Sequence, residues 1–242
     1  INTPLGAVDY SQWRAAQSVA IAINDKTRPV PLEYLLPPLL DKLKELEIPH
    51  SAVTFLIATG THKPLTQTET ALLVPPLVDA GYRVISHDCD DRTNLTYLGE
   101  TIRGTPIWIN QVFLEADVRI VVGDIEPHHF MGFSGGAKGA AIGLAGRETI
   151  NANHSMLIDP RADIGIYHQN PMRQDLEEIG DKINIHLVVN AVLNQSKEIV
   201  AVFAGKPREV VLAGMPVSLE VCVTQVKDRY DLVSASADGY PK

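Results

Sequence analysis

The chain has 242 residues, a formal net charge of −8 and 45% hydrophobic residues, which suits one large α/β domain or two small ones. An acidic chain without a basic block lacks the charge distribution of a nucleic-acid-binding protein. No apolar run is long enough to span a bilayer, so we expect neither nucleic acid nor membrane as a partner. Cys89 and Cys222 stand far apart, which favours reduced thiols and a cytoplasmic location over a cysteine zinc site.

In chain order, the first half of the sequence alternates apolar strands with amphipathic helices. The predicted elements are a strand at 18–24, a helix at 31–48 interrupted by Pro37 and Pro38, a strand at 52–58, a helix at 66–81 that opens at a threonine and closes at a glycine, a strand at 82–88, a hairpin at 95–110 with Gly104 in its turn, and a short helix at 111–116.

The second half repeats this alternation. It is predicted to form a strand at 117–125, helices at 146–159 and 170–183, strands at 183–194 and 198–205, a helix at 207–228 and a final strand at 230–236. Alternating strands and helices favour an α/β fold with an open, mainly parallel sheet and helices on both faces, which is a Rossmann-like arrangement.

Three polar segments follow predicted strands, namely "NDKTRPVP" at 24–31, "TGTHKP" at 59–64 and "EPHHF" at 126–130. In open α/β sheets, ligands bind beyond the carboxyl ends of the strands, so these loops are expected to meet in one crevice. Each segment also has a plain structural interpretation. Asp25 is a possible turn residue, Arg28 a surface cation and His62 a solvated histidine. His154 is a lone histidine on a predicted helix.

The residue types in these loops suit a small carboxylate ligand beside a phosphate-bearing cofactor. His62 and His128 could serve as an acid and base pair, because imidazole titrates near neutral pH. Arg28 has the planar fork that grips a carboxylate, and Asp25 could orient a neighbour or a substrate hydroxyl. The glycine-rich segment "FSGGAKG" at 133–139 offers backbone amides for a phosphate at Ser134, Gly135 and Gly136. Its lysine, Lys138, could pair with that phosphate or react covalently.

Four separated segments together resemble the nickel-pincer lactate racemase family: "NDKTRPVP", "ATGTHKP", "GDIEPHHFMGFSGGAKG" and "NANHSMLIDPRA". They occur in the order found in that family and cover most of the chain. The resemblance implies a racemase or epimerase of small 2-hydroxy acids, lactate racemase-like, that acts by proton-coupled hydride transfer to a lysine-linked nickel-pincer nucleotide. Dedicated cofactor-synthesis proteins would supply that cofactor. The sequence does not set the oligomeric state.

The same resemblance implies a role for each site residue. Lys138 would be the covalent attachment point and His154 the nickel ligand. His62 and His128 would be the two acid and base histidines, and Asp25 and Arg28 would contact the substrate. The residues expected to contact the cofactor besides Lys138 are Thr59, Gly60, Ser134, Gly135 and Gly136.

Two features differ from the family pattern. The family has a second domain that contributes a Tyr-Gln-x-x-Lys segment to the site, whereas this chain ends at "DGYPK". We therefore expect a catalytic and cofactor-binding N-terminal domain at 1–205, followed at 206–242 by a crossing helix and the start of a second domain. In addition, Ala137 stands where the family carries an arginine, which bears on phosphate contacts and on the choice of substrate.

Two alternative functions are weighed against the racemase. The first is a cofactor- or ligand-binding paralogue that has lost turnover; the retention of both His62 and His128 argues against it. The second is a zinc hydrolase using His62, His128 and His154. It is less favoured, because the close histidine pairing and carboxylate ligand typical of such sites are absent from the sequence.

Overall fold

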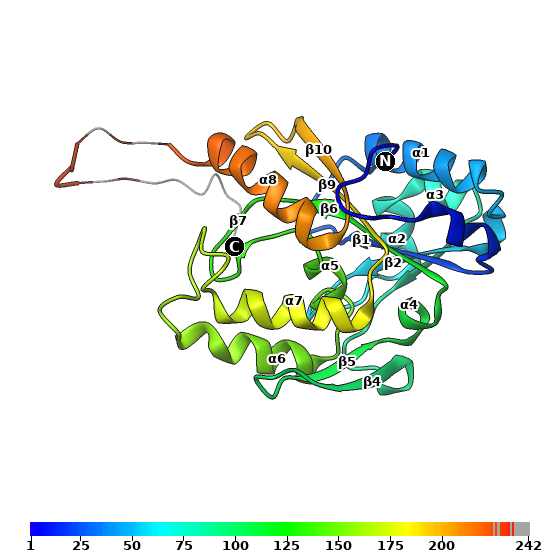
Figure 1. Ribbon diagram of the computed structural model, residues 1–242, viewed down its shortest axis with the longest axis horizontal. Helices are drawn as coiled ribbons and strands as arrows, with labels where there is room; N and C mark the ends of the chain where they lie inside the picture. Colours follow the sequence, from blue (N-terminus) through cyan, green and yellow to red (C-terminus); the bar gives the residue numbers. More distant parts are fainter. Residues whose placement is uncertain (225, 227, 233, 235–242) are drawn as a thin grey trace.

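A six-stranded sheet forms the centre of the chain in a computed structural model that describes residues 1–224, 226, 228–232 and 234 (Figure 1). The strand order is β10-β9-β6-β1-β2-β3. All neighbouring strands run parallel except β9 and β10, which are antiparallel. The strands are β1 Val19–Asn24, β2 Val53–Ala58, β3 Arg83–Ser86, β6 Val118–Asp124, β9 Leu187–Leu193 and β10 Ile199–Gly205. The predicted α/β fold with a mainly parallel sheet is confirmed.

Helices cover both faces of the sheet, because alternate residues of its strands feed two separate cores. One face of β1 packs under α1 (Leu32–Glu45) and α3 (Pro75–Asp79), and uses large side chains such as Ile21 and Ile23. The opposite face presents Ala20 and Ala22 toward the core that includes α4 (Gln111–Glu115), α5 (Lys138–Ala141), α7 (Pro171–Ile183) and α8 (Pro207–Cys222).

Small residues on this second face let α5 lie close to the strands. A Cβ on Gly139 would come within 2.6 Å of a Val121 methyl carbon, and one on Gly143 within 2.7 Å of Ala58 Cβ. Such distances leave no room for a side chain. The glycines therefore fix the short helix that begins with Lys138 against the ends of β2 and β6.

The predicted interruption of the first helix is wrong, because α1 runs through both Pro37 and Pro38. Both prolines are exposed, whereas Leu35, Leu36 and Leu39 are buried on the opposite side. A proline removes a hydrogen bond from the helix. Here the loss falls on the solvent side, where water can replace it, and the buried leucines keep the helix in place.

The predicted helix at 66–81 consists of two helices, α2 (Gln67–Leu73) and α3. It begins as expected at Thr66, whose hydroxyl accepts a hydrogen bond from the Glu69 amide at 3.3 Å. The break lies at Val74, which has φ −133° and ψ 57°. A residue before proline is displaced from the helical region, and Pro75 follows Val74 directly.

The remaining elements largely match their predicted positions. The hairpin is confirmed as β4 (Leu95–Glu100) and β5 (Pro106–Asn110), with Gly104 at φ 79° in the connection. The predicted helix at 146–159 contains α6 (Arg147–Ser155) and a 3₁₀ turn, Met156–Ile158. A small antiparallel pair, β7 (Pro127–His128) and β8 (Gly132–Phe133), was not predicted. Further 3₁₀ turns lie at Tyr10–Ala15, His50–Ala52 and Arg92–Asn94.

The C-terminal segment differs more from the prediction. The helix expected to reach 228 ends at Cys222, where Val223 adopts an extended conformation. Of the strand predicted at 230–236, residues 230–232 and 234 are described and none of them is in a strand, while 233, 235 and 236 lie outside the described residues. Through Val210 and Val211, α8 belongs to the same core as α7.

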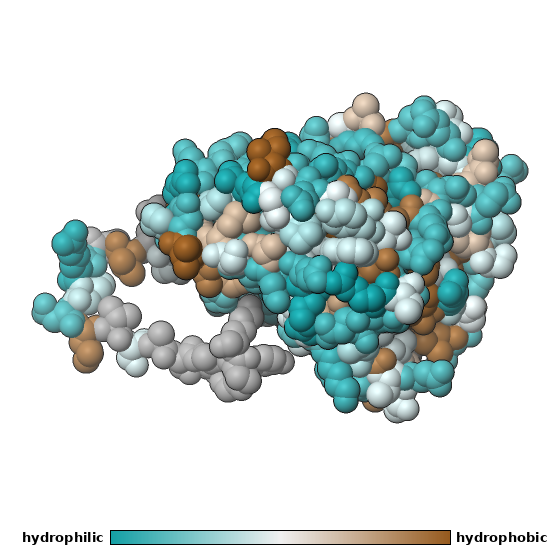
Figure 2. Space-filling model, turned by 90° about the horizontal axis from the view of Figure 1, so that it is seen from below, coloured by the Kyte–Doolittle hydropathy of each residue, from teal (hydrophilic) through white to brown (hydrophobic). Residues whose placement is uncertain are grey.

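The surface gives two further observations. The face seen in Figure 2 is mainly hydrophilic, with apolar side chains in small separate groups. Within the described part of the chain, no helix has the length and apolar character needed to cross a membrane.

Candidate active site

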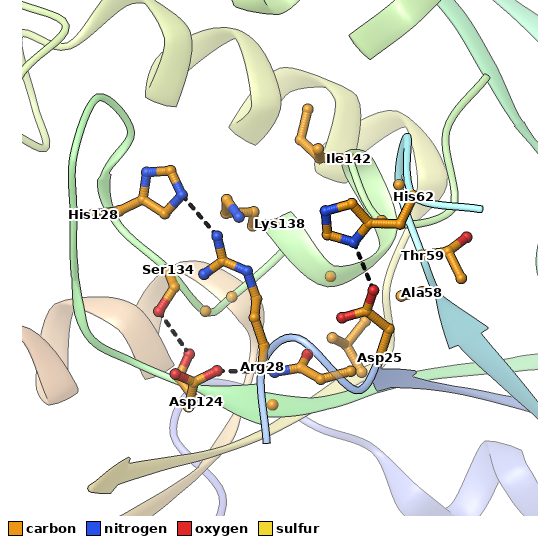
Figure 3. Close-up of a pocket in the computed structure, with 18 of the residues that line it drawn as sticks. Asp25, Arg28, Ala58, Thr59, His62, Asp124, His128, Ser134, Lys138 and Ile142 are labelled. Carbon is orange, nitrogen blue, oxygen red and sulfur yellow. Dashed lines mark hydrogen bonds and ion pairs between the residues drawn. The ribbon is translucent and has the colours of Figure 1, made fainter. Parts of the chain in front are cut away.

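The carboxyl ends of β1, β2 and β6 open into one pocket, where the structure brings together the three polar loops and the glycine-rich segment (Figure 3). Parallel neighbours end at the same edge of a sheet, so residues far apart in sequence meet there. The pocket is lined by every candidate site residue: Asp25, Arg28, Thr59, Gly60, His62, His128, Ser134, Gly135, Gly136, Lys138 and His154.

His62 is held by a buried carboxylate. Its Nδ1 lies 2.6 Å from Oδ2 of Asp25, whose other oxygen accepts hydrogen bonds from the backbone amide and hydroxyl of Thr27. The Asp25 side chain is 4% exposed and that of His62 is 55% exposed. The carboxylate therefore fixes the ring through Nδ1, which leaves Nε2 as the nitrogen that can exchange a proton with a ligand.

His128 has the opposite environment, since a cation faces it. Arg28 Nη2 lies 3.1 Å from His128 Nε2, and the Met131 amide donates to His128 Nδ1 at 3.3 Å. Burial of the ring, together with the charges of Lys138 and Arg28, lowers the pKa of His128 to about 2. The ring is thus a neutral base. Donors approach both of its nitrogens, but a neutral imidazole has only one acceptor nitrogen, so the two contacts cannot both be full hydrogen bonds.

Arg28 is only partly satisfied in this arrangement. In the part of the chain that the structure describes, its buried Nη1 has no hydrogen-bond partner, although Glu126 Oε1 lies 3.6 Å away in an ion pair. A buried guanidinium nitrogen without a hydrogen bond is costly, and an anion entering the pocket would remove that cost. Arg28 is therefore placed to receive a carboxylate.

Lys138 is the first residue of α5 and points into the pocket between the two histidine-bearing loops (Figure 3). Burial is the main cause that lowers the pKa of its amine to about 7, followed by the charge of Arg28, while Asp124 acts in the opposite direction. Near neutral pH a large share of this amine is uncharged. An uncharged amine is the form that reacts as a nucleophile.

The glycine-rich loop before Lys138 needs its glycines for backbone shape, since Gly135 and Gly136 have φ values of 79° and 62°. Two of the amides expected to hold a phosphate are already engaged. The Ser134 amide donates to the Glu126 carbonyl at 2.9 Å, and the Gly136 amide donates to Asn190 Oδ1 at 2.8 Å. They could hold a phosphate only by sharing these hydrogens or after the loop rearranges.

Thr59 and Gly60 shape the turn after β2. The Thr59 hydroxyl donates to the His87 carbonyl at 2.7 Å, and the Gly60 amide donates to the Gly143 carbonyl at 3.0 Å. Gly60 has φ 57°, which favours glycine. Both residues line the pocket through a turn that these bonds fix, and their contact with a cofactor stays a prediction.

His154 reaches the pocket from the last turn of α6. Burial and the charge of Lys138 lower its pKa, while the Ile150 carbonyl raises it. Apart from this contact with the Ile150 carbonyl, its buried Nδ1 has no hydrogen-bond partner among the described residues, and its ring packs edge-on against Phe130 with the centroids 5.3 Å apart. A neutral imidazole with an available lone pair is the form that binds a metal.

Sequence reasoning missed several polar residues on the floor of this pocket. Asn24 Nδ2 donates to Asp124 Oδ1 at 2.9 Å, and burial is the main cause that raises the pKa of Asp124. Asn190, which is fully buried, holds the glycine-rich loop. An asparagine within the apolar strand "LVVNAVL" was a usable signal, because a buried amide needs hydrogen-bond partners.

The three histidines do not form a common metal site. Among the described residues, the only group of at least three candidate ligands with ligand atoms within 4.8 Å of one another is Asp88, Cys89 and Asp90, outside the pocket. His62 instead pairs with a carboxylate, and His128 faces a guanidinium, whose charge would repel a metal cation.

A family model matches more than half of the chain. The lactate racemase N-terminal domain model matches residues 1–165, which include the loops that carry Asp25, His62, His128, Lys138 and His154. The chain belongs to the lactate racemase N-terminal domain family. The resemblance inferred from the four sequence segments is thus confirmed.

Individual lactate racemases agree with this assignment. The chain is 33% identical over 227 residues to lactate racemase from Thermoanaerobacterium thermosaccharolyticum, covering 93% of this chain and 53% of that protein. It is 30% identical over 244 residues to lactate racemase from Lactiplantibacillus plantarum, covering 100% of this chain and 57% of that protein. The chain therefore spans about half the length of the curated relatives that it matches.

Solved structures support the same fold. The lactate racemase apoprotein from Thermoanaerobacterium thermosaccharolyticum superposes with a TM-score of 0.85 at 32% identity, covering 91% of this chain and 53% of that one. A protein from Thermotoga maritima superposes with a TM-score of 0.70 at 22% identity, covering 89% of this chain and 55% of that one. The second likeness concerns the fold alone.

Proposed function

We propose that this lactate racemase N-terminal domain forms the cofactor-bearing half of a racemase or epimerase of small 2-hydroxy acids. The observation that supports it best is the pair of histidines, His62 and His128, which lie on opposite sides of Lys138 in Figure 3. Mirror-image hydroxy acids bound through the same carboxylate present their hydroxyl groups in different directions. A base on each side of the pocket lets either form exchange its hydroxyl proton.

The residues present fit the nickel-pincer nucleotide that the sequence resemblance implies. The pocket holds a lysine whose pKa is lowered to about 7, and it holds buried nitrogens of Arg28 and His154 that lack a full hydrogen bond to any described residue. Lys138 would carry the cofactor and His154 would bind its nickel. When bound, this group would supply the acceptor for the hydride from the substrate Cα, whereas the described side chains of the pocket can accept only protons.

The side chains of this chain would do the rest. Arg28 would bind the substrate carboxylate through its fork, and its shift toward that anion would release the contact with His128. One of the two histidines would then take the hydroxyl proton at Nε2, and the histidine on the other side, already protonated, would give a proton to the mirror-image product. Asp25 would keep the His62 ring oriented through Nδ1.

The test is to produce the full-length protein together with cofactor-synthesis proteins and to measure its intact mass and nickel content. A mass increase located on Lys138, about one nickel per chain, and interconversion of the two forms of a 2-hydroxy acid on a chiral column are expected. Lys138→Ala should lose the mass increase. An unmodified Lys138, in a host that loads a known lactate racemase, would instead indicate a divergent ligand-binding paralogue.

A zinc hydrolase is the alternative that the geometry disfavours. It would require His62, His128 and His154 to share one metal, whereas the first pairs with Asp25 and the second faces Arg28. Zinc bound in place of nickel, and lost in His62→Ala and His128→Ala, would support that alternative.

A further inference from the structure

A buried charged pair lies on α7, behind the glycine-rich loop. Arg173 is 0% exposed and Glu177 is 2% exposed, one helical turn apart. Arg173 donates to Glu177 Oε1 through Nε at 2.8 Å and through Nη2 at 2.5 Å. Burying two charges costs free energy that their attraction often fails to recover, so stability alone is a weak reason for such a pair.

The guanidinium also holds the backbone of the loop that carries Lys138. Arg173 Nη1 donates to the Phe133 carbonyl at 2.9 Å, and Nη2 donates to the Gly135 carbonyl at 3.4 Å. A Cβ on Gly136 would come within 3.1 Å of Nη2, which shows how closely the loop approaches. One rigid, planar group thus fixes two carbonyls that lie a few residues before the lysine.

Other residues hold the guanidinium in place. Glu177 Oε1 also accepts a hydrogen bond from the Tyr167 hydroxyl at 2.9 Å, and Glu177 Oε2 lies 3.9 Å from Arg208 of α8. The Tyr167 ring lies 5.0 Å from the Arg173 guanidinium carbon, in a cation–π arrangement. Arg173 is therefore fixed from two sides, as a group that sets the position of a loop must be.

The charge of Arg173 also acts on the lysine amine. A positive charge nearby disfavours a second one, and Arg173 is among the causes that lower the pKa of Lys138. The charged and titratable groups that act on or lie beside this amine come from several elements: Arg28, Asp124, Glu126, His128, His154 and Arg173. Among these described groups, Arg173 binds the backbone of the lysine's loop through its side chain.

We propose that Arg173 is a positioning residue for Lys138: it clamps the Phe133 and Gly135 carbonyls, with Glu177 and Tyr167 holding it, so that the amine faces the pocket ready to be modified. The proposal rests on the proposed function in one respect, namely that Lys138 is where the cofactor attaches. The clamp itself is a property of the loop, and can be tested without the cofactor.

The test measures how fast cyanate carbamylates Lys138 in the full-length protein, by peptide mass spectrometry over a range of pH. The uncharged amine adds to the carbon of isocyanic acid and its proton moves to the isocyanate nitrogen, so no leaving group is needed. The exposed Lys44 serves as an internal reference in every sample.

Two substitutions separate charge from position. Arg173→Met removes the positive charge and the hydrogen bonds to the two carbonyls. The carbamylation rate of Lys138 at pH 7 should therefore fall about threefold or more, and the midpoint of its pH profile should rise. Arg173→Lys keeps the charge but cannot hold two carbonyls, so the plateau rate should change while the midpoint stays near that of the unmodified chain. Lys44 should not change in either.

The matched control is Arg119→Met. Arg119 also donates to backbone carbonyls, those of Leu114, Ala116 and Asn184, but at the start of β6 rather than at the pocket. An unchanged rate and midpoint at Lys138 in Arg173→Met, or an equal change in Arg119→Met, would overturn the proposal. If the arginine variants do not fold, Tyr167→Phe provides the test. A smaller fall in the Lys138 rate is expected in this variant, and an unchanged rate would contradict the clamp.

These outcomes are distinct from those of the proposed function. If the carbamylation rate of Lys138 depends on Arg173 but the protein never takes up the cofactor, the clamp is supported and Lys138 is not the site of cofactor attachment. Cofactor loading of Arg173→Met at the rate of the unmodified chain, seen by intact mass, would overturn the clamp and support the attachment.

Discussion

The Nδ1 atom of His62 lies 2.6 Å from Oδ2 of Asp25, whereas the Nε2 atom of His128 lies 3.1 Å from Nη2 of Arg28. The two histidines proposed to exchange the substrate proton therefore start from opposite electrostatic environments. A carboxylate stabilises a protonated imidazole, and a guanidinium opposes it. For His128 to accept the substrate proton, Arg28 would have to move away from it. The proposed contact between Arg28 and the substrate carboxylate would cause that movement.

Asp25→Asn should slow racemisation while leaving cofactor and nickel in place. The amide keeps the size of the side chain but is a weaker partner for the Nδ1 atom that orients the His62 ring, so kcat should fall roughly 10²-fold. Steady-state rates in both directions, normalised to nickel content, provide the measurement. The matched control is Asp117→Asn, at the far end of β6, where the carboxylate accepts hydrogen bonds from the Gln17 and Ser18 amides and from the Ser18 hydroxyl. Equal losses in the two variants would contradict a direct role for Asp25.

The three pocket histidines should separate by metal retention. His62→Ala and His128→Ala are expected to abolish racemisation with nickel still bound, because neither is proposed to touch the metal. His154→Ala should lose nickel while the mass increase on Lys138 remains, because the covalent link does not need that imidazole. The measurements are the nickel content and the intact mass of each purified variant. Loss of metal in His62→Ala or His128→Ala would favour a shared metal site instead.

The buried, neutral His128 should make folding stability depend on pH on the acidic side. Its pKa is about 2 in the folded chain, against a usual value of 6.5. Between these values the unfolded chain binds more protons, so the contribution is complete above pH about 6.5 and is lost as pH falls, by up to about 1.4 kcal/mol per pH unit.

Replacing that ring should flatten this dependence. We expect the free energy of unfolding of His128→Gln, from urea titrations at several pH values, to fall less between pH 7.5 and pH 5 than that of the unmodified chain. Some slope should remain, because burial also lowers the pKa of His87 and His186. The control is the same substitution at the exposed His50. A stability curve for His128→Gln that runs parallel to that of the unmodified chain would refute the prediction.

Much of this site could be predicted from the sequence, because the polar loops follow strands whose apolar runs are unambiguous. Asp25 comes directly after β1 and His62 lies in the loop that follows β2; the two strands pair in register, so their loops had to meet. The helix at 31–48 was predicted less well, since a proline in the sequence does not reveal whether its missing hydrogen bond faces water. In α1 the positions of the missing hydrogen bonds face water, and the helix continues.

The residues that support the loop could not be predicted in the same way. Arg173 and Glu177 belong to "NPMRQDLEEI", in which charged residues outnumber apolar ones and a solvated helix face is the ordinary interpretation. Their burial depends on contacts with Phe133 and Gly135, about forty residues earlier. Such contacts are set by the packing of α7 on the loop, which no local pattern records.

The conformation of the glycine-rich loop gives the last prediction. Gly136 has φ 62°, and a Cβ there would come within 2.4 Å of a Val211 methyl carbon. Gly165 has a similar φ of 74° but nothing within 4 Å of its Cβ position. Gly165→Ala should therefore cost only the backbone strain, about 1–2 kcal/mol of unfolding free energy. Gly136→Ala should cost roughly 1–3 kcal/mol more, because α8 has to move.

The same pair of variants tests whether the loop sets the reactivity of Lys138. Denaturant titrations give the two free energies of unfolding, and cyanate labelling gives the reactivity of the amine. Gly136→Ala should alter labelling of Lys138 relative to Lys44, because the strained residue lies two positions before the lysine. Gly165→Ala should leave that ratio unchanged. Equal stability losses with unaltered labelling would show that the loop tolerates a side chain at Gly136 by a local shift that does not reach Lys138.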